Sequence, residues 1–507
     1  MMGRDHRKLT SGLPQLTWLR RGGLVVAALG SVLLALTGSL PVGQAADSAP
    51  PRYRIQWAPC PGSATTQCGT LRVPVDWSQP RGEQLSIAVA RHPASDPGHR
   101  IGTLFFNPGG PGDGAARYVV AADTFFSKTL RSRFDIVGID PRGIGASTPI
   151  RCGTPVLTPE STFFPRTRQE FDRFRAHNRA VGQSCLQATG DQVRHSDTVS
   201  VARDHEALRI ALHARQVSWL VLSYGTQVAA NYAQLYPKRT RAMVLDAALE
   251  HSAPEVLLTA EAISTVENGF NRFARWCDTA PDCALRGQDV AAVYDRLVER
   301  ANRHPMPVKG ALRPVTGDDI RMNTPHWLQL KDANVFGGPD LSWATLSKLI
   351  QLAVAGDASG FIFPPPQGPT DPFFGQAANA CGDYAVDIHT YGDMQRRIQM
   401  GKQLAPHLQG ASENWQLVLC VGWPVPPANP PRRLDVTGVP TLIVHATHDP
   451  STSYKNAFGL AAQIRGSAVL TRTGDGHTSY YTSNCARTAI DRYLVHPQAP
   501  PAAVCRT

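Results

Sequence analysis

The sequence predicts an α/β fold, in which a mostly parallel β-sheet carries helices on both faces. Short apolar runs alternate with segments of helical periodicity along the chain, as strands and helices do in such folds. One run, Val217 to Leu222, breaks at Ser223-Tyr224-Gly225 and resumes as a helical pattern through Tyr236. A serine on a turn from strand to helix is typical of a nucleophile elbow, where the turn lifts the hydroxyl above the sheet.

The chain is expected to begin the sheet with an antiparallel pair. Residues 68–77 and 85–91 have strand character, and the turn residues 80–82 separate them. The parallel part of the sheet is expected from the apolar runs 103–106, 134–139, 217–222, 242–245, 441–444 and 468–471.

A long gap separates the run that ends near Asp246 from the run that begins near Thr441. It is helical in pattern and then rich in Pro and Gly over residues 361–375. A structureless loop of that length is implausible in a compact domain. We therefore expect a cap subdomain over the carboxyl edge of the sheet, where ligands bind in open α/β folds; an unrelated second domain is the alternative. The predicted organisation is a core of residues 46–250 and 436–507 with a cap of residues 251–435.

The first 45 residues are predicted to be an export signal. Basic residues precede the apolar run 23–40, and Gly43-Gln44-Ala45 favours cleavage after Ala45. A membrane anchor is the alternative, but Gly, Ser and Thr interrupt the run, which is barely long enough to span a bilayer. The pair Arg20-Arg21 leaves a twin-arginine route open. We expect a secreted or cell-envelope protein with no stable membrane span after signal removal.

The composition is that of a globular protein with a sizeable core, because 42% of the 507 residues are hydrophobic and 18% are charged. The formal net charge is +11, but Arg and Lys are scattered, so no nucleic-acid partner is expected.

Ten cysteines agree with export, because an even number in an exported chain favours disulfides. No Cys-x-x-Cys has a matching second pair, which argues against a zinc site. Spacing does not fix connectivity, but proximity suggests the pairs Cys60 with Cys68, Cys152 with Cys185, Cys277 with Cys283, Cys381 with Cys420, and Cys485 with Cys505.

A serine nucleophile needs a base to take its proton and a third group to hold that base. Asp449 stands in the turn after the run 441–444, and His477 stands after the run 468–471. Their order along the chain and their places at strand ends predict Ser223 as nucleophile, His477 as base and Asp449 as acid. The weaker alternatives are His445 and His448 for the base and Asp475 for the acid.

Two glycine-containing loops follow predicted strands. Residues 107–112 form a loop nearly bare of side chains, so backbone N–H groups can approach a ligand closely. We assign the oxyanion hole to the N–H groups of Gly110 and Tyr224. The second loop, residues 140–147, lacks a Walker Lys and the G-x-G-x-x-G spacing and is interpreted as scaffold.

Together these motifs resemble the proline-iminopeptidase and tripeptidyl-aminopeptidase group of secreted bacterial α/β-hydrolases. The resemblance covers most of the mature chain. It implies an α/β-hydrolase fold with a cap over the site, no cofactor, and release of short N-terminal peptides from a peptide substrate by Ser223, His477 and Asp449. It rests on residues 68–77, 107–112, 140–143, 147–149, 223–226, 449–450 and 474–477, and on Cys152, Cys485 and Cys505.

Two positions depart from the group's usual pattern. Val221 stands where members have Gly, and Asp113-Gly114 stands where Gly-Ser continues the oxyanion loop. Residues two before and two after the serine come close in an elbow, so Val221 is expected to distort the turn or to lower activity, and Val221→Gly is expected to preserve or raise turnover. An aminopeptidase also needs a carboxylate in its cap for the free α-amine; the candidates are Asp383 and Glu267.

Two other functions remain open on sequence alone. An esterase or lipase on the same fold would carry the same triad, because the triad does not distinguish an ester from an amide. A non-catalytic cell-envelope binding protein is the third possibility; the intact Ser223, Asp449 and His477 argue against it, while Val221 argues slightly for it.

Overall fold

The computed structural model describes residues 53–332, 340–498 and 503–506. Residues 51–507 cluster as one compact unit. The predicted signal peptide, residues 1–45, lies outside the described residues. Within the described ranges, no helix combines the length and the apolar character needed to cross a membrane.

A ten-stranded sheet is the frame of this unit. The strands are β1 (Ala58–Pro59), β2 (Gln67–Pro74), β3 (Gln84–His92), β4 (Gly102–Asn107), β5 (Phe134–Ile139), β6 (Val217–Leu222), β7 (Thr240–Asp246), β8 (Thr441–His448), β9 (Ala468–Asp475) and β10 (Ala503–Arg506). Their order across the sheet is β1-β2-β3-β5-β4-β6-β7-β8-β9-β10. The pairs β1–β2, β2–β3 and β3–β5 are antiparallel, and the remaining pairs are parallel. The predicted fold class, with its antiparallel start, is confirmed.

Strand bounds match the sequence prediction most closely at the centre of the sheet. β5 and β6 have the predicted bounds, because their residues are mostly apolar. β8 and β9 run four residues further than predicted, through polar residues, to His448 and Asp475. Pairing between the two strands continues over these polar ends after an irregularity between Ala446 and His448. Side-chain polarity therefore marks neither the end of the strand nor the end of burial, since His445 and Arg472 lie beyond the predicted ends and are buried.

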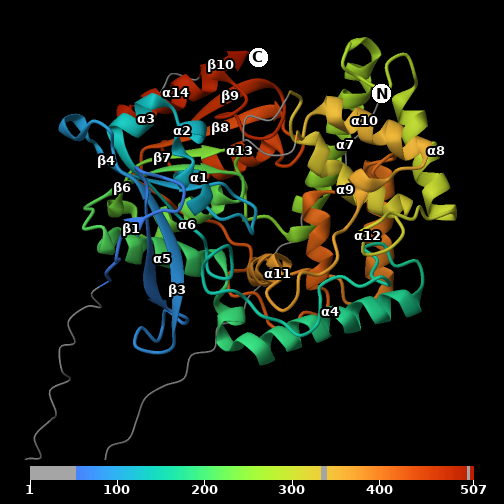
Figure 1. Ribbon diagram of the computed structural model, residues 1–507, viewed down its shortest axis with the longest axis horizontal. Coiled ribbons are helices and arrows are strands. Elements are labelled where there is room, and N and C mark those ends of the chain that lie inside the picture. Colours follow the sequence, from blue (N-terminus) through green and yellow to red (C-terminus); the bar gives the residue numbers. More distant parts are fainter. Residues whose placement is uncertain (1–52, 333–339, 499–502, 507) are drawn as a thin grey trace, which may run out of the picture. The chain divides into compact units, whose positions relative to one another are not determined.

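Helices cover both faces of the sheet (Figure 1). The first group is α5 (Thr198–Ala211), α6 (Gly225–Leu235) and α13 (Tyr454–Ala461), and the second is α1 (Ala116–Val120), α2 (Ala122–Phe125), α3 (Lys128–Arg133) and α14 (Asn484–Val495). Successive residues of a strand point to opposite faces. Along β6, Trp219 and Val221 pack in the cluster of the first group, whereas Leu220 and Leu222 pack in the cluster of the second.

The segment between β7 and β8 is mainly helical, as predicted, and has its own apolar cluster. Its helices are α7 (Glu255–Thr279), α8 (Val290–Arg303), α9 (Gly317–Leu328), α10 (Trp343–Ala355), α11 (Pro372–Asp383) and α12 (Tyr391–Leu404), with 3-10 segments η4 (Ser359–Phe361) and η5 (Glu413–Cys420). Three further 3-10 segments, η1 (Pro97–His99), η2 (Gly190–His195) and η3 (Pro237–Arg239), lie in the core sequence.

One helix outside the predicted cap bounds also packs with the cap. α4 (Arg168–Thr189) contributes Phe171 and Phe174 to the cap's apolar cluster. The Asn178 amide donates to the carbonyl oxygen of Val421, at 3.1 Å. Figure 1 shows α4 running along the lower edge of this half, below α11 and α12. The cap is thus assembled from two separate stretches of sequence.

All five predicted disulfides are formed, and the prediction by proximity is confirmed. Cys152–Cys185 ties the segment after β5 to α4. Cys381–Cys420 ties α11 to η5 inside the cap.

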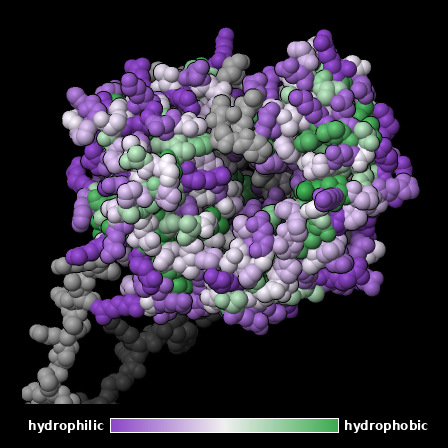
Figure 2. Space-filling model, viewed as in Figure 1, coloured by the Kyte–Doolittle hydropathy of each residue, from purple (hydrophilic) through white to green (hydrophobic). Residues whose placement is uncertain are grey.

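The apolar clusters lie inside the molecule. The face drawn in Figure 2 is mainly hydrophilic, and its hydrophobic residues form separate patches. Among the described residues, few large apolar side chains are exposed, with Val504, Leu257 and Phe458 the most so. Most large apolar side chains of the described residues are therefore buried in the core and the cap, and they do not form a broad apolar outer surface.

Candidate active site

Ser223 occupies the turn between β6 and α6 in a strained conformation. Its φ is 53°, in the left-handed region that non-glycine residues rarely adopt. Its N–H donates to the Asp246 carbonyl oxygen at 2.9 Å, and its carbonyl oxygen accepts from the Thr226 N–H at 2.9 Å. A Cβ on Gly225 would stand 2.8 Å from the Asn107 carbonyl oxygen, so this position needs glycine. These contacts give the elbow that the sequence predicts.

Val221 is fully buried below the elbow. It belongs to the cluster that includes Trp219 of β6 and Ala229 of α6. The core therefore has space for the valine side chain at a position where the resembling group carries glycine.

The glycine loop after β4 packs directly against the elbow. Gly109 has a φ of 108°, and a Cβ there would stand 2.8 Å from the Cβ of Ser223. Gly110, Ser223 and Tyr224 all line one cavity. The two residues whose N–H groups are assigned to the oxyanion hole thus line the same cavity as the serine. Asp113, further along this loop, instead accepts from the Tyr118 hydroxyl at 2.7 Å.

His477 is held by Asp449. The Nδ1 atom of His477 lies 2.9 Å and 2.8 Å from the two carboxylate oxygens of Asp449. Asp449 is buried and also accepts from the N–H groups of Ser451 at 2.8 Å and Thr452 at 3.0 Å. Burial alone raises the pKa of Asp449, but the charge and hydrogen bond of His477 outweigh it and lower the pKa to about 2. An ionised carboxylate at Nδ1 leaves Nε2 to take a proton.

Asp246, at the end of β7, joins the elbow to the loop that carries His477. Its carbonyl oxygen accepts from the Ser223 N–H. Its carboxylate accepts from the N–H groups of Ser479 and Tyr480, both at 2.7 Å. Burial raises the pKa of Asp246 to about 6. The sequence analysis treated Asp246 only as the end of a strand. An acidic residue at the carboxyl end of a central strand could have indicated that Asp246 lies close to the site.

The weaker triad alternatives lie elsewhere. His445 is buried within β8, where Nδ1 contacts the Ala446 carbonyl oxygen at 3.0 Å. His448 ends β8 opposite Asp475 in the strand register. Asp475 is paired with Arg272 of α7. The structure brings Asp449, and not Asp475, to His477.

The cavity above Ser223 has a volume of about 380 Å³ and is lined by residues of both the core and the cap. Its cap side is mainly apolar, with Phe163, Ile362 and Leu417 among the lining residues. Asn323, Gln376 and Gln416 contribute uncharged polar groups. No Asp, Glu, Lys or Arg is among the lining residues in the described part of the chain. The site therefore presents an apolar surface to the group next to the reacting carbonyl.

Neither candidate for amine binding lines this cavity. Asp383 is fully buried at the end of α11, and its partners are Thr198 and Asn429. Glu267 is buried on α7 and accepts from the N–H groups of His407 and Leu408, both at 3.1 Å. Both carboxylates are engaged inside the protein rather than presented to the space above Ser223.

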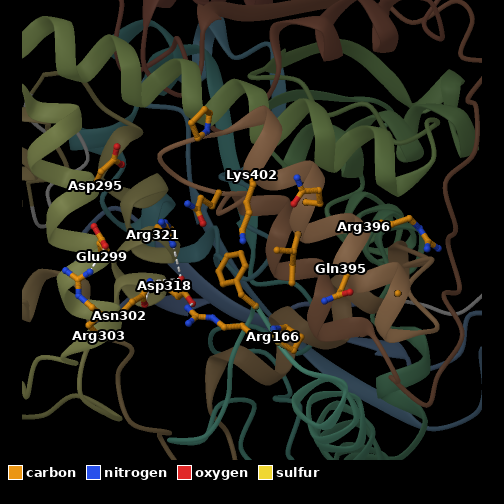
Figure 3. Close-up of a pocket in the computed structure, with 17 residues that line it drawn as sticks. Arg166, Asp295, Glu299, Asn302, Arg303, Asp318, Arg321, Gln395, Arg396 and Lys402 are labelled. Atoms are coloured by element: carbon orange, nitrogen blue, oxygen red, sulfur yellow. Dashed lines mark hydrogen bonds and ion pairs between the residues drawn. The ribbon is translucent and has the colours of Figure 1, made fainter.

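A larger cavity, of about 1210 Å³, lies on the cap between α8, α9 and α12. Its wall is charged, and Figure 3 shows Arg321 and Asp318 joined at its centre. Asp318 pairs with Arg166 at 2.8 Å and with Arg321 at 3.0 Å. None of the residues assigned to the chemistry lines it, so the reaction predicted from the sequence belongs to the smaller cavity.

Comparison with known proteins agrees with this geometry. Residues 406–505 match the family model described as TAP-like protein. The chain is 30% identical to the serine protease Hip1 of Mycobacterium tuberculosis, over 94% of this chain and 96% of Hip1. It is 28% identical to the tripeptidyl aminopeptidase of Streptomyces coelicolor, over 88% and 84% of the two chains. It is 30% identical to carboxylesterase B of M. tuberculosis, over 86% and 85%.

Proposed function

Because the chain belongs to the TAP-like family of α/β-hydrolases and is a serine hydrolase, we propose that Ser223, His477 and Asp449 are its catalytic triad. We further propose that it is an aminopeptidase, which releases short peptides or single residues from the N-terminus of peptide substrates. The observation that carries the triad is the buried Asp449 carboxylate on Nδ1 of His477, at 2.8 Å, in a loop that Asp246 joins to the elbow of Ser223.

The proposed reaction is acyl transfer. His477 takes the Ser223 proton through Nε2 as the hydroxyl oxygen attacks the carbonyl carbon, and the oxyanion accepts hydrogen bonds from the N–H groups of Gly110 and Tyr224. His477 then returns the proton to the leaving amine as the bond to it breaks, which gives the acyl-enzyme. Water, deprotonated by His477, attacks the acyl carbon and releases the acid and the free serine.

Two relatives support a peptide substrate, since their names are serine protease and tripeptidyl aminopeptidase. A second candidate function, carboxylesterase, is favoured by a specific observation: the described lining of the cavity holds no carboxylate for a free α-amine. An apolar acyl chain would fit such a lining without leaving a buried charge unpaired. The relative named carboxylesterase B supports the same candidate.

We propose that the protein acts outside the cytoplasm. Five disulfides in the described residues support an oxidising compartment. The basic and then apolar character of residues 1–45 supports export by a signal peptide.

The experiment that tests the triad is labelling with a fluorophosphonate probe, which reacts with an activated serine. We expect the wild-type protein to be labelled and Ser223→Ala to be unlabelled. Ser218→Ala is the matched control, because Ser218 is a buried serine of the same strand that does not line the cavity. Equal labelling of wild type and Ser223→Ala would contradict the proposal.

The experiment that separates the two substrate classes compares rates on three chromogenic compounds. These are a tripeptidyl p-nitroanilide with a free N-terminus, its N-acetylated form, and p-nitrophenyl butyrate. An aminopeptidase cleaves the first at least ~10-fold faster than the second, because roughly 1.4 kcal/mol of amine recognition corresponds to that factor. Comparable rates on both anilides, with a faster ester reaction, would favour the carboxylesterase.

A further inference from the structure

The side chain of Tyr224 is tied to the cap through one hydroxyl. Tyr224 follows the nucleophile, and its phenol is buried. The Tyr224 hydroxyl lies 2.6 Å from Oγ1 of Thr198, the first residue of α5. The Thr198 hydroxyl donates to the Asp383 carboxylate of α11 at 2.5 Å. Since a threonine hydroxyl has one proton, the Tyr224 hydroxyl is then the donor to Thr198. The Asn379 side chain of α11 is a further hydrogen-bond partner of this phenol.

Asp383 makes a second bond to the same threonine. The first N–H groups of a helix have no partner within the helix. The Thr198 N–H, at the start of α5, donates to the other carboxylate oxygen of Asp383 at 3.0 Å. The Asn429 amide donates to that oxygen at 2.8 Å. The end of α11 therefore caps α5 and fixes the direction of the Thr198 hydroxyl.

The cap holds this end of α11 from several sides. The Cys381–Cys420 disulfide joins it to η5. The Asn379 amide donates to the Ser196 carbonyl oxygen at 2.7 Å, and the His251 ring contacts the Asp383 carbonyl oxygen at 2.9 Å. Asp383 thus has a fixed position relative to both the cap and the start of α5.

Burying the Asp383 carboxylate costs more free energy than a purely structural contact requires. It is fully buried, and the described residues place no Lys or Arg in an ion pair with it. Burial is the largest cause that raises its pKa, and the nearby Asp197 raises it further, to about 7. A buried carboxylate without a cation costs free energy that an apolar residue of similar size would not.

We propose that Thr198 and Asp383 are positioning residues for the oxyanion hole, which act on the backbone N–H of Tyr224 by holding its side chain against the cap. Tyr224 then has both ends fixed, one by the elbow and one by the hydrogen-bond chain. The position of α11 in the cap therefore sets the direction of one oxyanion donor. This inference rests on the proposed function.

The test uses the full-length mature enzyme, a fluorophosphonate probe and p-nitrophenyl butyrate. Thr198→Val removes the hydroxyl at nearly constant shape, and Thr198→Ser is the matched control that retains it. Complete loss of an oxyanion donor costs about 10²–10³-fold in kcat. A donor that points in the wrong direction should reduce kcat less than the loss of the donor does. We therefore expect kcat to fall about 10-fold in Thr198→Val with KM unchanged. The kcat of Thr198→Ser should stay within about 2-fold of wild type.

Tyr224→Phe tests the same chain from its other end and serves if Thr198→Val does not fold. We expect a loss similar to that of Thr198→Val, and no further loss in the double variant, because both substitutions break one chain. Thermal unfolding of each variant checks that the fold is intact.

The outcomes separate this inference from the proposed function. A wild-type protein that neither takes the probe nor hydrolyses the ester would overturn both. If the wild type is active but Thr198→Val and Tyr224→Phe have the same kcat as Thr198→Ser, the inference alone would be overturned. The same holds if these two substitutions change KM and leave kcat unchanged. Additive losses in the double variant would also overturn it.

Discussion

Two fully buried carboxylates have pKa values that are shifted in opposite directions. Asp449, after β8, faces the His477 imidazole and is ionised, with its pKa lowered to about 2. Asp383, at the end of α11, faces only Thr198 and Asn429, and burial raises its pKa to about 7. Both belong to hydrogen-bond chains that lead toward the reacting carbonyl, one through the base and one through Tyr224.

The difference shows that burial alone does not set the charge of a group. Desolvation is the largest single cause at both sites. Only Asp449 has a partner that becomes positive during the proposed reaction, so only there does ionisation stabilise a developing charge. Asp383 acts by geometry in our proposal, and burial opposes its ionisation.

Removing the charge of Asp449 is expected to have the largest effect. Asp449→Asn should lower kcat by about 10⁴-fold, because the base then takes the wrong tautomer. Asp383→Asn, which removes the charge at the other site, should lower kcat by less than about 10-fold. Ester hydrolysis measures both variants under one condition. Losses of similar size in the two variants would remove the distinction between them.

The pH dependence of stability should differ in sign between the two sites. The folded pKa of Asp383, about 7, exceeds its ordinary value of 3.8. The folded state therefore holds the proton between about pH 4 and 7 while the unfolded chain has lost it, and stability falls as pH rises through this window. The folded pKa of Asp449, about 2, lies below 3.8, so its contribution is lost as pH falls from about 4 toward 2.

Asp383→Asn is the variant that tests this contrast. We expect the decrease in unfolding temperature between pH 5 and pH 7.5 to be a few degrees smaller in Asp383→Asn than in wild type. Differential scanning calorimetry measures it. An unchanged decrease would show that Asp383 is already ionised in the folded state across this range.

The smallest effect on activity is expected at Val221, which belongs to neither of the two hydrogen-bond chains. Val221→Gly should leave kcat within about 2-fold of wild type or raise it, because the side chain packs in the core below the elbow. It should lower the free energy of unfolding by roughly 2–3 kcal/mol, since it removes a buried side chain and puts glycine into a strand. A large loss of kcat with an intact fold would mean that Val221 shapes the elbow itself.

The sheet and its central strands were predictable because their signals are local. Buried parallel strands are continuous apolar runs, and β5 and β6 have the predicted bounds. Ser223, Asp449 and His477 each follow such a run, so a one-dimensional pattern located them. In the structure, Asp449 contacts Nδ1 of His477, and Gly110 and Tyr224 line the same cavity as Ser223.

The second hydrogen-bond chain was not predictable, because its contacts are distant in sequence. Thr198 and Asp383 meet across 185 positions, and neither has a motif. Asp383 was expected to face a substrate amine, and only the packing of α11 on α5 shows that its carboxylate is enclosed. The place of α4 in the cap is similarly set by packing between segments that no sequence pattern links.

The order of the strands makes completion of the site a late event in folding. β7, which follows the elbow, pairs with β8, yet all cap helices except α4 lie between them in the sequence. The proposed acid and base both follow strands made after the cap. A chain emerging from the ribosome therefore has the serine long before it has the base, and long-range pairing is slow to form. Nascent chains lacking β8 and β9 cannot activate Ser223, so acyl transfer is withheld until synthesis is complete.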